Sequence, residues 1–465
     1  MTASEQEIIT LRHEILDELR AILIERLRVT LPPEQLDPDT ILFGSGLALD
    51  SVDAVDLAVE IERRRRVRVG DTPESRQALR TLGTLVEVLL DHALASADGG
   101  EAEPPTPLRF AADDPSPLAR DCEALRRRVG LICAPDLRRV RVQGPAAFDL
   151  IDRLSSRDVF IRSGQILHTL FLDPRGHAWA DVHAAADDDD FVLFVEGPSR
   201  TELLDYLRDA ITPGESVEIL DLEDTHACLD LSGPFAWELM DRLVGPEVLG
   251  IPYLNFFDLP ELGGLAFRMG KTGEYAYQLL IPRAQASAAE QRLRELGEGF
   301  ELREVSDAAI DLCAIETGFF CARESALRGR SPLELQLQCR ISDTREVPGM
   351  AALRAARARG EPVHQIRWFV ADNAQTPAAG AALWREGTRV GEVLLAHRSA
   401  AVGAHVGIAL LELAWSEPGL SLTDASGQPL LATAVAPLVR SSSLSVDPQR
   451  HTFATREADG LIDLV

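Results

Sequence analysis

The sequence predicts a multidomain protein in which a small all-α domain precedes a larger region of mixed helices and strands. With 465 residues, the chain is longer than one ordinary domain. Residues 1–96 show helical periodicity, whereas the chain from about residue 119 alternates short apolar strands with helices. Residues 97–118 between them hold five prolines and two glycines. Such a composition is typical of a linker, and as a flexible coil this one would span about 25 Å.

The composition excludes several classes of protein. Hydrophobic residues make up 46% of the sequence and charged residues 26%, as in a globular protein. The formal net charge of −27 argues against nucleic acid as a partner, because phosphate binding requires clustered cations. No apolar run is long enough for a membrane span and the N-terminus is acidic, so we expect a cytoplasmic protein without membrane contact. The six cysteines show neither a CxxC motif nor zinc spacing, so we expect reduced thiols and no metal site.

The first 96 residues are predicted to form four helical segments. LRHEILDELRAILIERL places apolar residues on one helical stripe, namely Leu11, Ile15, Leu19, Ile22 and Leu23. LPPEQLDPDTILFGSG follows as a long loop with Pro and Gly punctuation. A short acidic helix then begins near Ser51, and TLGTLVEVLLDHAL supplies the last apolar helix.

The dipeptide Asp50-Ser51 stands at the start of the acidic helix. One interpretation is structural only, because Asp or Ser can serve as the N-cap and acids in the first turn suit the helix dipole. The surroundings favour a function, since valines and acids lie on separate faces at helical spacing. The apolar face holds Val52, Val55 and Val59, and the acidic face holds Asp53, Asp56 and Glu60. A serine in this place is exposed and locally ordered, which suits a modification site.

The stretch LFGSGLALDSVDAVDLAVEIE resembles the modification motif of the acyl carrier protein family, and the resemblance covers residues 1–96. It implies that a phosphopantetheinyl transferase attaches a phosphopantetheine arm to Ser51, and that the arm's thiol holds an acyl or aminoacyl cargo. The acidic helix would dock basic patches on cargo-loading and downstream biosynthetic enzymes. Two departures from the family are Val52 in place of the usual leucine and the four arginines Arg63–Arg66 after the helix.

The second region is predicted to begin with four strands, RRVRVQG, ILHTLFLD, HAWADVHAAA and FVLFVEG, separated by helices and turns. From about Val347 onward, alternating apolar segments predict an all-β unit. We therefore divide the chain after the linker into residues 119–346, residues 347–450 and a tail of residues 451–465.

The strand at residues 177–186 is the best candidate for a site. In an extended strand Trp179, Asp181 and His183 share one face, where a carboxylate and an imidazole could form a polar site in an apolar wall. The alternative is a sheet face turned to water, where Asp and His need no special explanation.

Blocks including VGLICAPDLRRVRVQGPAAFDLIDRLSSRDV, GQILHTLFLDPRGHAWADVHAAA and GKTGEYAYQLLIP resemble, in order, the aminomethyltransferase (glycine-cleavage T protein) family. The resemblance covers roughly residues 119–440. It implies an α+β ring of three subdomains around a tetrahydrofolate pocket, the last being a C-terminal β-barrel. Members of the family move one-carbon units between folate and an amine, sulfur or oxygen substrate.

Individual positions match the family's site only in part. Asp181 matches the aspartate at the reaction centre, and with His183 and His168 it forms the predicted catalytic set. Lys271, the only lysine of the chain, takes a tyrosine's position in the turn GKTGE, and His168 also replaces a tyrosine. Gln278 replaces the glutamate that grips the pterin edge, whereas Glu316 is retained. We predict that Gln278, Lys271 and Glu316 contact the cofactor.

Two departures bear on folate. Ile310 stands where an arginine usually helps to hold folate, and the exchange removes up to five hydrogen-bond donors. The change to Gln278 replaces an acceptor with an amide donor, so another ring edge would fit. Lys271 has two interpretations, an exposed cation of a tight turn or a partner for a ligand's phosphate or carboxylate.

Three hypotheses for the function follow. The first is transfer of a one-carbon unit between tetrahydrofolate and a cargo held on Ser51, in a specialised-metabolite pathway, since tethering raises the effective concentration to about the millimolar range. The second keeps the fold but not folate, and has Asp181, His168 and Lys271 rearrange, eliminate or hydrolyse the cargo. The third is a non-catalytic carrier and docking protein.

Overall fold

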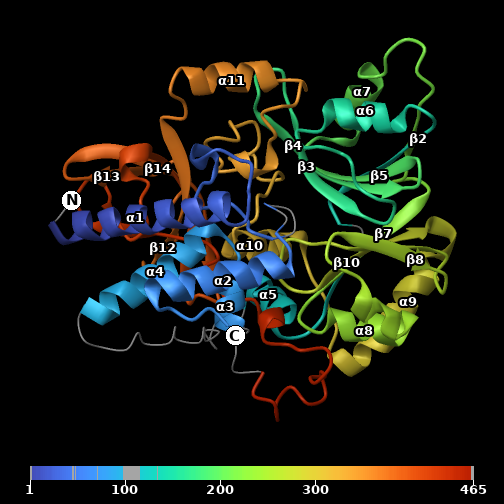
Figure 1. Cartoon of the computed structure of the whole chain (residues 1–465). Helices are drawn as coiled ribbons and strands as arrows, with labels where there is room; N and C mark the ends of the chain where they lie inside the picture. Colours follow the sequence, from blue (N-terminus) through green and yellow to red (C-terminus); the bar gives the residue numbers. More distant parts are fainter. Residues whose placement is uncertain are drawn as a thin grey trace.

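The computed structural model describes residues 3–43, 47, 49–70, 72–97, 116–133 and 135–461. They form a helical N-terminal domain, two β-sheets with helices on their faces, and a C-terminal β-barrel (Figure 1). Among these residues, no helix is both long and apolar enough to cross a membrane. Residues 98–115, most of the predicted linker, lie outside the described residues, and the chain continues in α5 (Pro117–Arg127).

The N-terminal domain contains the four predicted helices. They are α1 (Ala3–Glu25), α2 (Ser51–Arg65), α3 (Pro73–Ala78) and α4 (Leu82–Ala97), with a short 3-10 helix η1 (Pro33–Gln35) after α1. The predicted stripe of α1 faces the interior, where it meets apolar residues of α2 and α4 such as Leu57 and Leu85. The N-terminal domain therefore has a core of its own.

A five-stranded antiparallel sheet has the order β3-β4-β5-β2-β6. Its strands are β2 (Arg138–Gln143), β3 (Ile166–Leu172), β4 (Ala178–Asp187), β5 (Asp190–Glu196) and β6 (Glu218–Asp221). The helices α6 (Ala147–Leu154) and α7 (Arg200–Asp209) cover one face through a shared apolar cluster. The four strands that the sequence predicts at the start of this region are thus β2 to β5.

A six-stranded sheet has the order β11-β1-β7-β10-β9-β8, and β11 runs parallel to β1. Its strands are β1 (Gly130–Cys133), β7 (His226–Ser232), β8 (Asn255–Leu259), β9 (Gly264–Arg268), β10 (Ala276–Pro282) and β11 (Arg303–Glu304). The helices α8 (Ala236–Val244) and α9 (Ala286–Gly297) cover its outer face. The inner face packs against the five-stranded sheet through residues such as Phe194, Phe267 and Leu280.

A closed six-stranded barrel completes the fold and confirms the predicted C-terminal β-barrel. Its strands are β12 (His364–Ala371), β13 (Ala382–Arg385), β14 (Thr388–Ser399), β15 (Ala404–Glu412), β16 (Ser421–Thr423) and β17 (Pro429–Ala434). The helix α10 (Asp307–Thr317) packs between the sheets and the barrel, and α11 (Met350–Ala358) precedes β12. From the segment predicted as a tail, Phe453 and Leu461 are buried in the cluster under α8.

The position of Trp179 differs from the prediction. The register between β3 and β4 shifts at Phe171 and Leu172, so that Trp179 becomes the extra residue of a β-bulge. Its ring packs 4.5 Å from that of Tyr206 on the α7 side of the sheet. The expectation that Trp179 shares a face with Asp181 and His183 is therefore wrong, because the bulge breaks the strand's alternation just before Asp181.

Candidate functional site

Two strand ladders bring the predicted catalytic residues together. His168 of β3 lies opposite His183 of β4, and Asp181 of β4 lies opposite Glu196 of β5. Residues that face each other in an antiparallel ladder point to the same side, as do residues two apart in one strand. The four side chains therefore share the face of the sheet that looks toward the centre of the fold, and all four are buried.

Asp181 is held by three partners. Its Oδ1 lies 2.7 Å from Nε2 of His168 and accepts a 2.9 Å hydrogen bond from Arg340. Its Oδ2 lies 2.5 Å from Nζ of Lys271. Burial alone would raise the pKa of Asp181, but the positive charges around it outweigh burial and hold the pKa well below the usual range. Asp181 is therefore a carboxylate that orients its neighbours, and is too weakly basic to remove a proton readily.

Lys271 lies inside the protein. Its side chain is 6% exposed, and Nζ donates to Glu196 at 2.6 Å and to the carbonyl of Phe320 at 2.9 Å, besides its ion pair with Asp181. Burial would lower the pKa of Lys271, but the two carboxylates raise it above its usual value. The interpretation of Lys271 as an exposed turn cation is wrong, because the turn after β9 points the side chain inward between two buried acids.

The two histidines form a stacked pair with ring centroids 4.0 Å apart. Burial, together with the charge of Arg340, lowers the pKa of His168 to about 4, and burial places that of His183 well below its usual value. Both imidazoles are thus neutral at pH 7. Nε2 of His168 lies 2.7 Å from Oδ1 of Asp181 and 3.0 Å from Nη1 of Arg340. Since a carboxylate only accepts, the shorter contact assigns the proton of His168 to Nε2, so that Arg340 donates to Asp181 and Nδ1 of His168 keeps a lone pair. Within the described chain, this Nδ1 and Nε2 of His183 have no hydrogen-bond partner.

Gln278 lies on the inner face of the other sheet, paired with an acid that the prediction missed. It stands opposite Asp230 in the β7–β10 ladder, and its amide donates to Asp230 at 2.5 Å. Ser232 donates to the other oxygen of Asp230 at 2.7 Å. Burial raises the pKa of Asp230 to about 6. The strand sequence HACLDLSG holds this single acid among apolar residues, which is the signal that could have identified it.

Glu316 of α10 is engaged by protein groups. One oxygen accepts from Arg126 of α5 at 2.8 Å and the other from Ser399 of β14 at 2.7 Å. Arg126 also pairs with Glu274 at 3.0 Å, so a fully buried network joins three parts of the chain. Direct contact between Glu316 and a cofactor would require one of these bonds to be exchanged. The run of three arginines at residues 126–128 gave no sign that its first member is buried.

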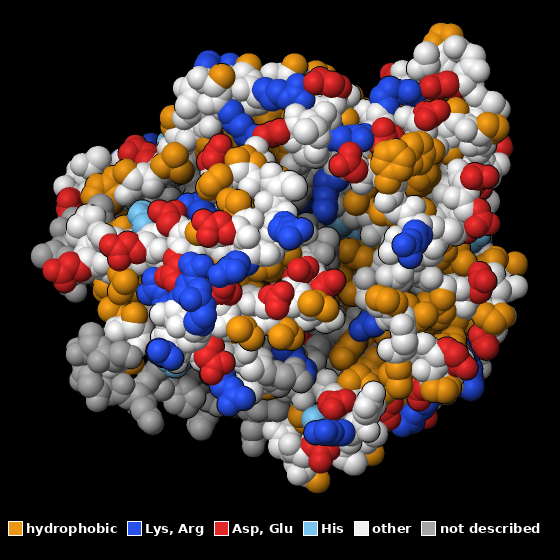
Figure 2. All heavy atoms as spheres, viewed as in Figure 1, with side chains coloured by type: hydrophobic (Ala, Val, Ile, Leu, Met, Phe, Trp, Pro, Cys, Tyr) orange, Lys and Arg blue, Asp and Glu red, His pale blue; other side chains and the backbone are white. Residues whose placement is uncertain are grey.

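Ser51 lies at the start of α2, and the local sequence explains the helix start. Asp50 is the N-cap, since its carboxylate accepts from the backbone N–H groups of Val52 and Asp53, and Asp53 accepts in return from the N–H of Asp50. Ser51 itself is exposed. The valines of the predicted apolar face are exposed too, Val52 to 66%, Val55 to 61% and Val59 to 57%. In Figure 2, apolar side chains lie along α2 on the surface, and basic side chains gather at its C-terminal end.

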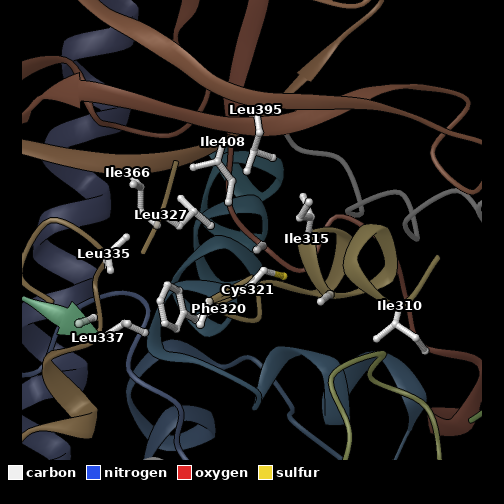
Figure 3. Packing of buried hydrophobic residues seen from close by; sticks show 14 of the residues in the cluster. Ile310, Ile315, Phe320, Cys321, Leu327, Leu335, Leu337, Ile366, Leu395 and Ile408 are labelled. Atoms are coloured by element: carbon white, nitrogen blue, oxygen red, sulfur yellow. The ribbon is translucent and has the colours of Figure 1, made fainter. Parts of the chain in front are cut away.

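The N-terminal domain contacts the rest of the fold with other surfaces. A cavity of about 50 Å³, the shared cavity, lies between the N-terminal domain and the larger region. The N-terminal domain lines it with Asp39, Ile41, Arg80 and Thr81, and the larger region lines it with apolar side chains and with Thr317, Gln336, Cys339 and Arg340. Figure 3 shows part of the apolar wall, including Phe320, Leu327, Leu335 and Leu337. Since Arg340 also donates to Asp181, the cavity ends at the Asp181 network.

These residues allow two cofactors to be tested. An exposed serine at a capped helix start fits attachment of phosphopantetheine. A pterin beside Asp181 does not fit, because Lys271 fills the space next to the carboxylate and the cavity that reaches Arg340 holds only about 50 Å³. Ligand pockets typically measure about 300–1,000 Å³. Ile310 belongs to the buried apolar cluster of α10 and supplies no donor.

Comparison with known families agrees with this architecture. The family profile described as "Phosphopantetheine attachment site" matches residues 17–89. The profile described as "GCVT N-terminal domain" matches residues 104–344, just over half of the chain. The chain therefore joins a carrier domain to an aminomethyltransferase-like region. It belongs to the GCVT N-terminal domain family.

The relatives are similar to the larger region. The gamma subunit of heme-dependent oxidative N-demethylase from Ectopseudomonas mendocina is 28% identical over 327 residues, which cover 66% of this chain and 83% of that protein. Aminomethyltransferase from Thermotoga petrophila is 24% identical over 62% of this chain and 79% of its own. The solved structure of the glycine cleavage system aminomethyltransferase T from Bartonella henselae has a TM-score of 0.60 at 19% identity, over 70% of this chain and 90% of that one. This likeness confirms the fold.

Proposed function

We propose that this chain is an enzyme that modifies a substrate held as a thioester on its own carrier domain, with Ser51 as the attachment point of the phosphopantetheine arm. The shared cavity carries this proposal, because residues of the carrier domain and Arg340, the partner of Asp181, line the same cavity. Backbone hydrogen bonds connect Arg80 to Leu42 and Leu42 to Leu49, two residues before Ser51. The arm therefore starts close to the carrier residues that line the cavity, and a thioester on it would reach Arg340 only after the cavity, now about 50 Å³, has widened.

Arg340 in the cavity lining and the groups next to it favour proton transfer on the bound substrate. The neutral imidazoles of His168 and His183 each have an unpartnered nitrogen. With a pKa of about 4, the lone pair on His168 Nδ1 is a weak base at pH 7, so proton transfer to it depends on stabilisation of the developing oxyanion. Nε of Arg340 is likewise unpartnered within the described chain, so it can donate to a developing oxyanion. Removal of the proton next to the thioester carbonyl would begin a rearrangement or an elimination. This is the folate-independent hypothesis, and the geometry supports it best.

One-carbon transfer to or from tetrahydrofolate is the second candidate. Family membership supports it, since the relatives are named aminomethyltransferase and oxidative N-demethylase subunit. The pair formed by Asp230 and Gln278 supports it too. The family's glutamate corresponds to Gln278, and the buried carboxylate of Asp230 lies opposite Gln278 on the neighbouring strand. Binding would require Lys271 to leave the space beside Asp181.

Hydrogen exchange on the carrier-bound substrate tests the first candidate. The full chain is loaded from a panel of acyl and aminoacyl coenzyme A thioesters by a phosphopantetheinyl transferase, and mass spectrometry in D₂O then follows deuterium next to the thioester carbonyl. We expect exchange in the wild type and its loss in Asp181→Asn, with loading of Ser51 unchanged. Asp188→Asn, in the exposed β4–β5 turn, is the matched control. No exchange with any cargo would reject the candidate.

Calorimetric titration of the full chain with tetrahydrofolate separates the second candidate from the first. The first candidate requires no binding at millimolar ligand. Saturable binding that Gln278→Ala weakens would place folate at the β7–β10 pair and make one-carbon transfer the better description.

A further inference from the structure

Arg80 differs from the other cations at the centre of the molecule. Arg126, Lys271 and Arg340 are each paired with a buried carboxylate. The guanidinium of Arg80 makes neither an ion pair nor a hydrogen bond with any of the described residues. It lies over an aromatic ring, 4.9 Å from the centroid of Phe319, and Tyr253 and Glu274 are near enough to act on its charge. In a chain with a net charge of −27, an unpaired cation that faces a cavity is unusual.

The backbone fixes Arg80 in the lining of the shared cavity. Its carbonyl accepts from the N–H of Leu42, and the neighbouring Thr81 bridges to Ile41. The ring of Phe319 supports the guanidinium from the other side, because a cation is attracted to an aromatic face. The side chain is thus held in place by both the carrier domain and the larger region, with its donors unused.

The surroundings suit a small anion. A cavity needs about 10–15 Å³ for each water, so 50 Å³ holds a few waters or one carboxylate or phosphate group. Burial lowers the pKa of Arg80 to about 10, which leaves this partly exposed side chain charged at pH 7. Asp39 is the acid among the lining residues, and burial raises its pKa. Arg340, in the same lining, is already paired with Asp181.

We propose that Arg80 is a substrate-binding residue that the carrier domain contributes to the pocket of the larger region, where it binds an anionic oxygen group, carboxylate or phosphate. This inference rests on the proposed function for the identity of the molecule that enters. The anion has two possible sources, the phosphodiester of the arm on Ser51 or a carboxylate of a substrate. The carrier domain would then act in recognition as well as in delivery.

Anion binding by the full chain tests this inference without turnover. In a Ser51→Ala background, which carries no arm, inorganic phosphate and succinate are titrated calorimetrically. A hydrogen-bonded ion pair contributes about 1.5–3 kcal/mol, so Arg80→Gln should weaken binding about tenfold or more, and Arg80→Lys should retain part of it. Because no reaction is followed, failure of the proposed function would leave this result unchanged.

Arg76→Gln is the matched control, since Arg76 lies four residues earlier in the same domain and donates to the carbonyl of Leu444 across the same interface at 3.1 Å. Equal loss of binding in both variants, or full binding in Arg80→Gln, would overturn the inference. The holo protein separates the two sources. A ³¹P resonance of the arm that shifts on Arg80→Gln assigns the phosphodiester, whereas an unchanged resonance together with succinate binding assigns a substrate carboxylate.

Discussion

Lys271 determines what the central site can hold. A compact ammonium on a flexible stem can approach two carboxylates at once, and Nζ lies within 2.6 Å of both Asp181 and Glu196. The charge of Asp181 is therefore neutralised within the chain. A substrate amine or a pterin would have to compete with a cation that is already bound.

Substitution of Lys271 tests this view. Lys271→Ala leaves two buried acids without their shared partner, and we expect a loss of about 3–5 kcal/mol in the free energy of unfolding, measured by thermal or denaturant unfolding. The space that the side chain vacates is suited to a small ammonium ion, so added methylammonium should restore part of the stability. Lys271→Met fills the same space without charge and should not be rescued. If Lys271→Ala were as stable as the wild type, the ion pairs of Lys271 with Asp181 and Glu196 would contribute nothing to the free energy of unfolding.

Which site residues the sequence could predict depends on how local their signals are. Asp181 and His183 share a strand, so period-two alternation places them together. His168 and Gln278 required family resemblance, because their partners lie on other strands. Arg340 and Arg80 were missed, since each reaches the centre only through contacts far along the chain, and neither stands in a pattern that distinguishes it from 45 other arginines.

At the scale of elements, α2 has one face for the core and another for solvent. Leu57 and Ile61 are buried, whereas the three valines on its opposite face are each more than half exposed in the described structure. The larger region is docked against the loop before α2 and against Arg80, away from this face. The exposed face of α2 thus stays open to a partner in trans while the carrier domain remains docked.

A charge on this face should block modification without unfolding the domain. Val55→Asp changes a side chain that is 61% exposed, so we expect a change in stability within about 0.5 kcal/mol. The rate at which a phosphopantetheinyl transferase modifies Ser51 should fall about tenfold or more, because the added charge disrupts apolar docking. Val363, which precedes the first barrel strand, is 62% exposed, so Ser51 of the Val363→Asp variant should be modified at the wild-type rate. Normal modification of Val55→Asp would exclude this face as the docking surface.

Element types followed from the sequence more reliably than their details. The helix start at Asp50-Ser51 and the alternating strands of the five-stranded sheet carry local signals, and both occur as predicted. The bulge that removes Trp179 from the site depends on the register between two strands, which the strand's own sequence does not specify. Similarly, Phe453 and Leu461 are buried because α8 offers them a surface, and their own segment has no periodicity that indicates it.

At the scale of the whole molecule, polar contacts hold the carrier domain against the larger region. Glu5 pairs with Arg385 at 2.8 Å, His13 with Glu417 at 2.8 Å, and Glu74 with Arg440. These pairs lie near the surface, where each contributes about 0–1 kcal/mol and is weakened by salt. A carrier domain held in this way can leave the shared cavity, which a domain that must also visit loading enzymes requires.

Ionic strength should therefore control how the carrier domain docks. At 1 M salt the screening length falls to about 3 Å, so we expect the full chain to expand relative to low salt, measured as a larger radius of gyration in small-angle X-ray scattering. Glu74→Arg should produce expansion at low salt because it places two arginines together, and the double variant Glu74→Arg/Arg440→Glu should restore compactness by reversing the pair. The contradicting outcome is the same radius of gyration for the wild type and both variants at every salt concentration. Apolar contacts around the shared cavity would then hold the domains together, and delivery from Ser51 would occur without undocking.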